Sequence, residues 1–129
     1  MSDAENTGPE IKHGGISWNE LITSDPAGAI KFYTTLFGWE TEKFAGSAVD
    51  YTMFKHDGRA FGGVMATPRP GVPTHWTTYV VVEDIDAALA RCASLGGTTC
   101  MGPMDIPDVG RIAVIQDPQG ATIGLHECL

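Results

Sequence analysis

The feature that most constrains the fold of this chain is a weak internal repeat. Similar residues recur 58 positions apart in the two halves, at Trp18 and Trp76, Asp25 and Glu83, Ala29 and Ala87, Gly38 and Gly96, and Thr41 and Thr99. No single pair is persuasive, but together the pairs align strand with strand and helix with helix. The repeat therefore predicts that one order of secondary-structure elements occurs twice.

The first half shows that order clearly. A strand-like segment is followed by Ser24-Asp25-Pro26, which places a capping side chain before a proline in the first helical turn. Apolar residues then recur at helical spacing as far as Gly38, which predicts the end of a helix. Turn residues separate the segments after it, so we expect strands at 17–23, 40–44, 51–55 and 59–66.

The second half repeats this order after a connector. The connector is the stretch 67–74, which holds three prolines and a glycine and cannot form a central strand or a helix. A loop is expected at 102–110, which is rich in proline and acidic residues. The remaining pattern predicts a strand at 75–82, a helix at 85–95 and strands at 98–101, 111–116 and 121–127.

A βαβββ unit has an apolar sheet face that it cannot cover alone, and two such units can pair their sheets. We therefore expect an α+β fold in which two βαβββ modules form an incompletely closed, cleft-containing mixed β-barrel. The cleft would be a natural site for a small organic molecule. The expected organisation is a flexible tail at 1–13 and a single domain at 14–129, with module one at 14–66, a linker at 67–74 and module two at 75–129.

Charge and cysteine content narrow the class of partner. Sixteen acidic and eight basic residues give a net charge of −8, which disfavours nucleic acid and anionic membrane surfaces as partners. No apolar run approaches the ~20 residues of a membrane span, and the first residues show no signal-peptide pattern. Three cysteines, Cys92, Cys100 and Cys128, cannot all pair, so we expect free thiols and a cytoplasmic location.

Several short motifs occur in a family-specific order. They are Ala29 to Tyr33, Leu36-Phe37-Gly38-Trp39, Val82 to Ala88, Leu95-Gly96-Gly97, Pro103 to Arg111 and Asp117-Pro118-Gln119-Gly120-Ala121. In this order the chain resembles the glyoxalase-related branch of the vicinal oxygen chelate superfamily, which includes glyoxalases, bleomycin-resistance proteins and extradiol dioxygenases. The resemblance implies the paired-module fold and a homodimer. The fold alone does not select among isomerases, lyases, dioxygenases and drug-sequestering proteins.

The resemblance also points to four positions on the strands. Metal-dependent members carry His, Glu or Gln ligands on the first and last strands of each module. The corresponding positions here are Trp18, Gly63, Trp76 or Thr78, and Gly124. None of these side chains is a competent ligand for a divalent metal. We therefore predict no cofactor and assign these residues to ligand binding, although a shifted alignment would still allow a divalent metal.

Two other residues could supply chemistry to the expected cleft. Strand alternation puts Glu20 on the same face as Trp18, and His126 on the same face as Gly124. A carboxylate and an imidazole are suited to general acid–base catalysis. The alternatives are a paired structural carboxylate for Glu20 and a structural or solvated side chain for His126. Trp18 and Trp76 either fill the core or line the cleft with aromatic rings.

Two functions follow from this reading. The first is a glyoxalase-like lyase or isomerase that acts on a small molecule in an aromatic-lined cleft, with Glu20 and His126 as catalytic groups and without the usual metal ligands. The alternative is a non-catalytic protein of the bleomycin-resistance type, which binds or sequesters a small molecule.

Overall fold

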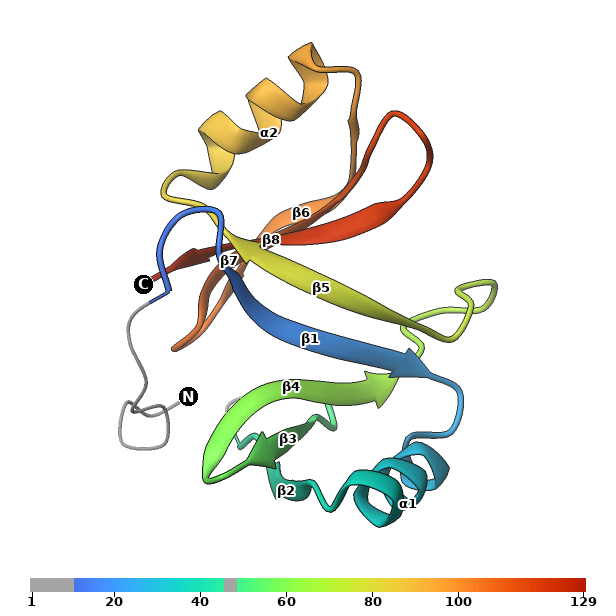
Figure 1. Cartoon of the computed structure of the whole chain (residues 1–129). Helices are drawn as coiled ribbons and strands as arrows, with labels where there is room; N and C mark the ends of the chain where they lie inside the picture. The colour runs from blue at the N-terminus through green and yellow to red at the C-terminus, as the bar shows by residue number, and fades with distance from the viewer. Residues whose placement is uncertain (1–10, 46–48) are drawn as a thin grey trace. The chain divides into compact units, whose positions relative to one another are not determined.

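The computed structural model describes residues 11–45 and 49–129. Residues 1–10 of the expected tail and 46–48 of an expected turn lie outside the described residues. The element order is βαβββ twice, with β1 Ile16–Thr23, α1 Pro26–Phe37, β2 Glu40–Lys43, β3 Thr52–His56, β4 Arg59–Ala66, β5 His75–Val81, α2 Ile85–Ser94, β6 Thr98–Ile106, β7 Gly110–Gln116 and β8 Thr122–Cys128 (Figure 1). The α+β class and the two βαβββ modules are therefore confirmed.

The described residues divide into two compact units that nearly coincide with the modules. The first unit is Trp18–Trp76, and the second comprises 11–17 and Thr77–Leu129. Residues 67–74 form neither helix nor strand. Each module is described by itself below. The cleft between the modules and the single-domain organisation stay predictions.

In module one, helix α1 starts and ends where the sequence predicts. The Asp25 side chain accepts a hydrogen bond of 3.0 Å from the Gly28 backbone N–H, and Pro26 occupies the first turn. At the other end Gly38 adopts a left-handed conformation, with φ of 74°, which a residue with a side chain would adopt only at a cost. Both ends of α1 are therefore set by local sequence.

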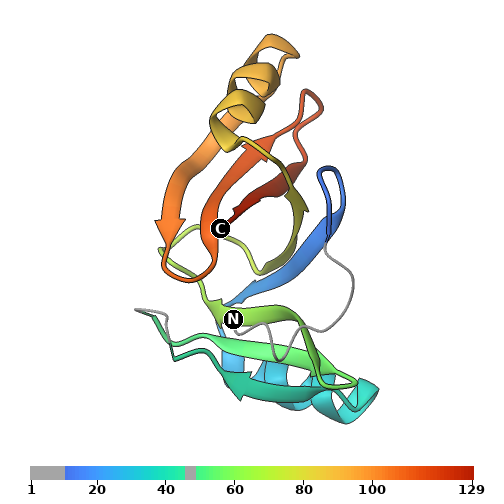
Figure 2. The same cartoon turned by 90° about the vertical axis from the view of Figure 1, so that its left-hand side faces the viewer.

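The sheet of module one has the strand order β2-β3-β4-β1, with β1 parallel to β4 and the other pairs antiparallel. Helix α1 lies on one face of this sheet (Figure 2). Leu21, Phe54 and Val64 form the buried core on that side, and α1 contributes Ala29, Ile30 and Tyr33 around it. The opposite face carries no helix of this module.

Module two is built in the same way with different residues. The Asp84 side chain caps α2 by accepting from the Ala87 backbone N–H at 3.1 Å. The strand order is β5-β8-β7-β6, with β5 parallel to β8 and the other pairs antiparallel. Its core on the α2 side is aliphatic and consists of Val82, Ile85, Ala113 and Leu125.

One sequence prediction in module two is wrong. The expected loop at 102–110 is mostly strand, because β6 continues to Ile106 and pairs with β7. The proline is accommodated at an irregularity in the ladder between Met101 and Met104, where Gly102 and Pro103 have no partner in the register. Proline excludes a regular central strand, but it does not exclude an edge strand with a bulge.

Within the described part of the chain, neither helix is long and apolar enough to cross a membrane.

Candidate functional site: two helix-free sheet faces

Each module has a sheet face opposite its helix, which we call its helix-free face. In module one, Met53, Gly63 and Glu20 are paired across β3, β4 and β1. Directly paired residues share a face of a sheet. This row alternates with the row of Leu21, Val64 and Thr52, whose apolar members pack towards α1. Glu20 and Gly63 therefore belong to the helix-free face.

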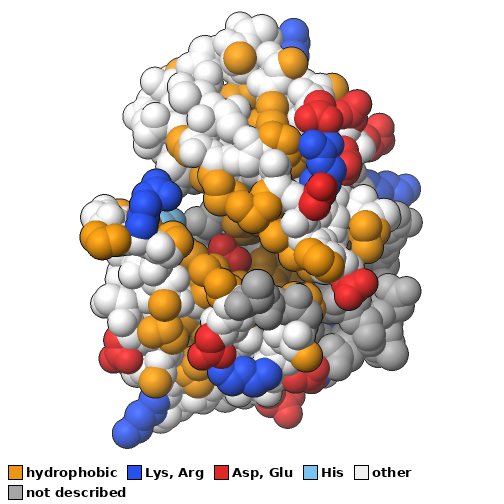
Figure 3. Space-filling model, turned by 180° about the vertical axis from the view of Figure 1, so that it is seen from behind, with side chains coloured by type: hydrophobic (Ala, Val, Ile, Leu, Met, Phe, Trp, Pro, Cys, Tyr) orange, Lys and Arg blue, Asp and Glu red, His pale blue; other side chains and the backbone are white. Residues whose placement is uncertain are grey.

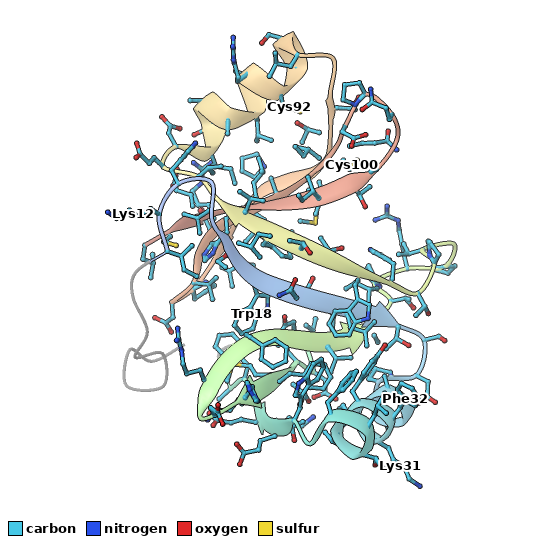
Figure 4. All side chains as sticks on the ribbon, in the orientation of Figure 1. Lys12, Trp18, Lys31, Phe32, Cys92 and Cys100 are labelled. Carbon is cyan, nitrogen blue, oxygen red and sulfur yellow. The ribbon has the colours of Figure 1, made fainter. Side chains whose placement is uncertain are left out.

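A chain of two hydrogen bonds runs along the helix-free face of module one. The Trp18 indole Nε1–H donates to the Tyr51 hydroxyl at 2.8 Å. The Tyr51 hydroxyl in turn donates to Glu20 Oε2 at 2.9 Å. A tyrosine hydroxyl has one proton, so this geometry commits that proton to the carboxylate and orients both groups. The structure thus brings Trp18, which is labelled in Figure 4, and Glu20 together through Tyr51.

Gly63 explains how Tyr51 reaches Glu20. A Cβ atom placed on Gly63 would lie 2.2 Å from Tyr51 Cε1, far inside van der Waals contact. Tyr51 therefore crosses the sheet over the space that a side chain at position 63 would fill. Sequence reasoning assigned Gly63 to ligand binding, and here the space above it is filled by the tyrosine ring.

The same contact between a strand glycine and a tyrosine ring recurs in module two. Gly124 on β8 pairs with Tyr79 on β5, and a Cβ atom on Gly124 would lie 2.4 Å from Tyr79 Cδ2. Tyr79 is 5% exposed, so its ring is fixed in the interior. Each of the two glycines is covered by a tyrosine ring.

His126 lies on the same face as Gly124, two residues further along β8. Its Nε2 is 2.9 Å from the Val109 carbonyl oxygen, and its Nδ1 is 3.2 Å from Ser17 Oγ. A carbonyl oxygen can only accept, so Nε2 carries a proton. In the neutral ring Nδ1 is then the acceptor and Ser17 the donor. His126 is half-buried and held at both nitrogens.

Trp76 and Thr78 lie away from this arrangement. Tyr79 alternates with Thr78 along β5, so Thr78 and Trp76 share the other face of that strand. The Trp76 ring contacts Tyr33 edge-on at 5.4 Å between centroids, and its Nε1 is 3.3 Å from the Tyr33 hydroxyl. A ligand-binding role for Trp76 or Thr78 stays a prediction.

The structure groups the predicted site residues by module. Trp18, Glu20 and Gly63 belong to the first compact unit, and Gly124 and His126 to the second. A meeting of Glu20 with His126 in one cleft therefore stays a prediction. Sequence reasoning missed Tyr51 and Tyr79. Glycines inside strands were the available signal, because such a glycine often marks a close approach by another group.

The clearest electrostatic coupling lies on the surface of module two. Arg111 donates to both carboxylate oxygens of Asp86, at 2.8 and 3.3 Å. This hydrogen bonding lowers the pKa of Asp86 and raises the pKa of Arg111. On the face drawn in Figure 3, basic side chains are scattered among acidic and hydrophobic ones and do not gather into one patch.

The donor set does not fit the metal site that the resemblance implies. The corresponding positions hold an indole at Trp18 and no side chain at Gly63 and Gly124. The carboxylate of Glu20, which lies on the same face as Trp18, accepts a hydrogen bond from Tyr51. Within residues 11–45 and 49–129, no group of three or more His, Cys, Asp or Glu side chains could hold an ion.

Comparison with known proteins places this geometry in a family. The pattern of the Glyoxalase/Bleomycin resistance protein/Dioxygenase superfamily matches residues 15–125. The "Putative glyoxylase CFP32" of Mycobacterium bovis is 43% identical over 109 residues, which are 84% of this chain and 42% of that protein. The "Anthracycline biosynthesis protein DnrV" of Streptomyces peucetius is 36% identical, over 87% of this chain and 46% of that protein. The chain spans less than half the length of these curated relatives.

Solved structures show the same fold at low identity. A Streptomyces coelicolor methylmalonyl-CoA epimerase variant in complex with 2-nitronate-propionyl-CoA has a TM-score of 0.60 and 20% identity, covering 88% of this chain and 96% of that one. A hypothetical protein from Bacillus halodurans has a TM-score of 0.64 and 10% identity, covering 89% and 94%. The repeated βαβββ order and the match over most of the sequence lead to one conclusion: the chain belongs to the glyoxalase/bleomycin resistance protein/dioxygenase superfamily.

Proposed function

We propose that this chain is a small-molecule enzyme of the lyase or isomerase type, in which Glu20 removes a proton from a carbon next to a carbonyl group. The observation that carries the proposal is the hydrogen-bond chain from Trp18 through Tyr51 to Glu20. A base must be held in one orientation to act on a bound substrate. The hydrogen-bond chain holds the Glu20 carboxylate in one orientation.

The chemistry of the carboxylate supports this role. A carboxylate offers about four lone-pair positions and is a suitable base for a C–H proton. Glu20 is half-buried on β1. An apolar ligand that covers it would exclude water, and the lower local dielectric would strengthen the electrostatic interaction of the carboxylate with a substrate C–H group. The aromatic rings of Trp18 and Tyr51 beside it would suit a flat organic molecule.

His126 is proposed as the second proton-transfer group. Its Nε2 proton is directed to the Val109 carbonyl, which leaves Nδ1 as the basic nitrogen of the neutral ring. In this proposal Glu20 takes the proton from the substrate, and His126 of module two passes to the product a proton that its Nδ1 first takes from solvent. The homodimer and the cytoplasmic location that the sequence suggested also remain proposals, and sedimentation of the purified chain tests the first.

The test is carbon–hydrogen exchange in D₂O, followed by proton NMR. Two probes cover the carbonyl classes that the relatives' names suggest, methylmalonyl-CoA and the hemithioacetal of methylglyoxal with a thiol. The Glu20→Gln variant keeps the size of the side chain and removes its basicity. We expect it to lose exchange by at least about 100-fold, the usual contribution of a general base.

Glu40→Gln is the matched control, because Glu40 is an exposed carboxylate on β2 of the same module. It should exchange like the unmodified chain. Exchange that survives in Glu20→Gln would refute Glu20 as the base. His126→Gln should lower net turnover without abolishing exchange catalysed by Glu20.

A second candidate is binding without turnover, as in the bleomycin-resistance type. The observation that favours it is that Glu20 and His126 are both already hydrogen-bonded to protein groups, as structural residues would be. Tryptophan fluorescence titration separates the two functions. A probe that binds the unmodified chain and Glu20→Gln equally, with no exchange in either, supports sequestration.

A further inference from the structure

Three side chains with exchangeable protons meet at the end of β8 in module two. His126 Nδ1 lies 3.2 Å from Ser17 Oγ and 3.8 Å from Cys128 Sγ, a distance within the reach of a sulfur hydrogen bond. Cys128 is exposed, whereas His126 is half-buried. All three residues belong to the second compact unit.

The tautomer of His126 suits it to act as a base here. Its Nε2 donates to the Val109 carbonyl oxygen at 2.9 Å, and a carbonyl cannot donate in return. The neutral ring therefore directs its Nδ1 lone pair towards Ser17 and Cys128. A nucleophile, a base and a third group that orients the base form the arrangement that activates cysteine in enzymes. Hydrogen bonds of this kind are often long in the absence of a reaction partner.

We propose that Cys128 is a nucleophilic thiol activated by His126, and that it adds to α,β-unsaturated carbonyl compounds. His126 Nδ1 takes the thiol proton, and Cys128 Sγ forms a bond to the β-carbon of the electrophile. The π electrons of the C=C bond move to the α-carbon, which takes a proton as His126 returns to its neutral form. The product is a thioether, no group leaves, and no oxidant or reductant is needed.

The other two cysteines provide an internal reference. Cys100 is exposed on β6, and Cys92 is half-buried on α2 (Figure 4). Among the described residues, which include all four histidines, Cys128 is the one cysteine with a hydrogen bond to a histidine ring. Cys100 therefore measures how an exposed thiol of this chain reacts without an imidazole beside it.

The experiment uses N-ethylmaleimide, a simple α,β-unsaturated carbonyl compound, on the native full chain. Labelling at limiting reagent is stopped at short times, and peptide mass spectrometry gives the rate at each cysteine. We expect Cys128 to react about tenfold faster than Cys100, because an imidazole beside a thiol increases the fraction of reactive thiolate. Equal rates at Cys128 and Cys100 would overturn the proposal.

Two variants identify the base. His126→Ala should bring the Cys128 rate down to that of Cys100, and an unchanged ratio of the two rates would also overturn the proposal. Ser17→Ala removes the hydroxyl that shares Nδ1 with Cys128 and should raise the ratio. If His126→Ala unfolds, which fast labelling of half-buried Cys92 would reveal, Ser17→Ala decides alone: a raised ratio supports the proposal and an unchanged one refutes it.

The inference shares His126 with the proposed function but does not depend on Glu20. Glu20→Gln should lose proton exchange on carbonyl probes and keep the Cys128-to-Cys100 ratio. Failure of one proposal is therefore visible without failure of the other.

Discussion

The two modules solve the same structural problem with different side chains. Both cover a strand glycine with a tyrosine ring on the helix-free face. In module one the ring comes from Tyr51, just before β3, and in module two it comes from Tyr79, inside β5. The core of module one is aromatic around Phe54, while the core of module two is aliphatic around Ile85. The fold thus leaves a space above a strand glycine in each module, and the local sequence decides which tyrosine ring fills that space.

This difference matters for function. Tyr51 is half-buried, precedes its strand and joins a polar chain that ends on a carboxylate. Tyr79 is buried within its strand. We therefore interpret Tyr51 of module one as the more movable of the two tyrosine rings, and Tyr79 of module two as its rigid counterpart. The following predictions test this contrast, starting with the largest expected effect.

The two cores should differ in how much free energy of unfolding is lost when one large buried side chain is truncated. Phe54 is fully buried, and its ring lies 5.2 Å from that of Trp39 and 6.4 Å from that of Phe61, centroid to centroid. Phe54→Ala should lower the free energy of unfolding by about 3–5 kcal/mol. Ile85→Ala, at a fully buried position in module two, should lower it by about 2–3 kcal/mol, at the lower end for such a truncation.

Urea unfolding followed by circular dichroism measures both values. Leu95→Ala, at a position that is 63% exposed, is the control and should change little. An Ile85→Ala variant that loses as much stability as Phe54→Ala would contradict the idea that the aromatic core is the stronger one.

Adding a methyl group at each of the two glycines should show which tyrosine ring is held rigidly and which can move. In Gly124→Ala the new Cβ meets the root of the buried Tyr79 ring, so we expect a loss of about 2–3 kcal/mol. In Gly63→Ala it meets the outer edge of Tyr51, which can swing away with the loss of its two hydrogen bonds, at a cost of about 1–2 kcal/mol. Thermal unfolding ranks the two variants, and the reverse order would show that Tyr51 is the rigid ring.

Removing the two hydroxyl groups tests the polar chain directly. Tyr51→Phe deletes the acceptor of Trp18 Nε1 and the donor to Glu20, so it should cost about 1–2 kcal/mol and shift the tryptophan emission spectrum. Tyr79→Phe is the matched variant in module two and should leave the emission spectrum unchanged. Identical spectra for all three proteins would argue against the bond from Trp18 to Tyr51.

The smallest effect concerns acid stability. Arg111 lowers the pKa of Asp86 below its ordinary value of 3.8 in the folded state. A depressed folded-state pKa contributes stability above the unfolded-state value, and this contribution is lost as the pH falls through the folded-state pKa. In Asp86→Asn the fall in Tm between neutral pH and about pH 2 should therefore be smaller than in the unmodified chain.

Asp50→Asn is the control in module one, where Asp50 pairs with Lys43 on the exposed surface. We expect Asp86→Asn to change the pH profile of Tm more than Asp50→Asn does. Equal profiles for the two variants would remove the distinction between these surface ion pairs.

Much of the fold could be predicted from the sequence because its signals are local. Asp25 and Asp84 cap the two helices by accepting from backbone N–H groups three residues later, and Gly38 ends α1 in a left-handed conformation. Strand boundaries were less accurate where proline was present. The segment around Pro103 reads as a loop, yet a bulge lets β6 continue past it.

The candidate site was predicted only in part, and register is the reason. The 58-residue repeat aligns Thr78 with Glu20, but Glu20 pairs with Gly63 and Tyr79 pairs with Gly124. The residue of β5 that occupies the place of Glu20 is therefore Tyr79, one position later than the 58-residue repeat predicts. A slip of one residue moves every side chain of a strand to the other face. Sequence similarity of Trp18 and Trp76 therefore concealed that they lie on opposite faces.

The sequence by itself determined the order of elements, the helix ends and the family, because capping, periodicity and turn chemistry act over a few neighbouring residues. Only the tertiary structure decided that Tyr51 lies between Trp18 and Glu20, and that Ser17, His126 and Cys128 meet. Each group joins two parts of the chain that are far apart in sequence, and the contacts between those parts depend on strand pairing and register. Such long-range pairings follow from the packing of the whole module, which no local pattern of residues contains.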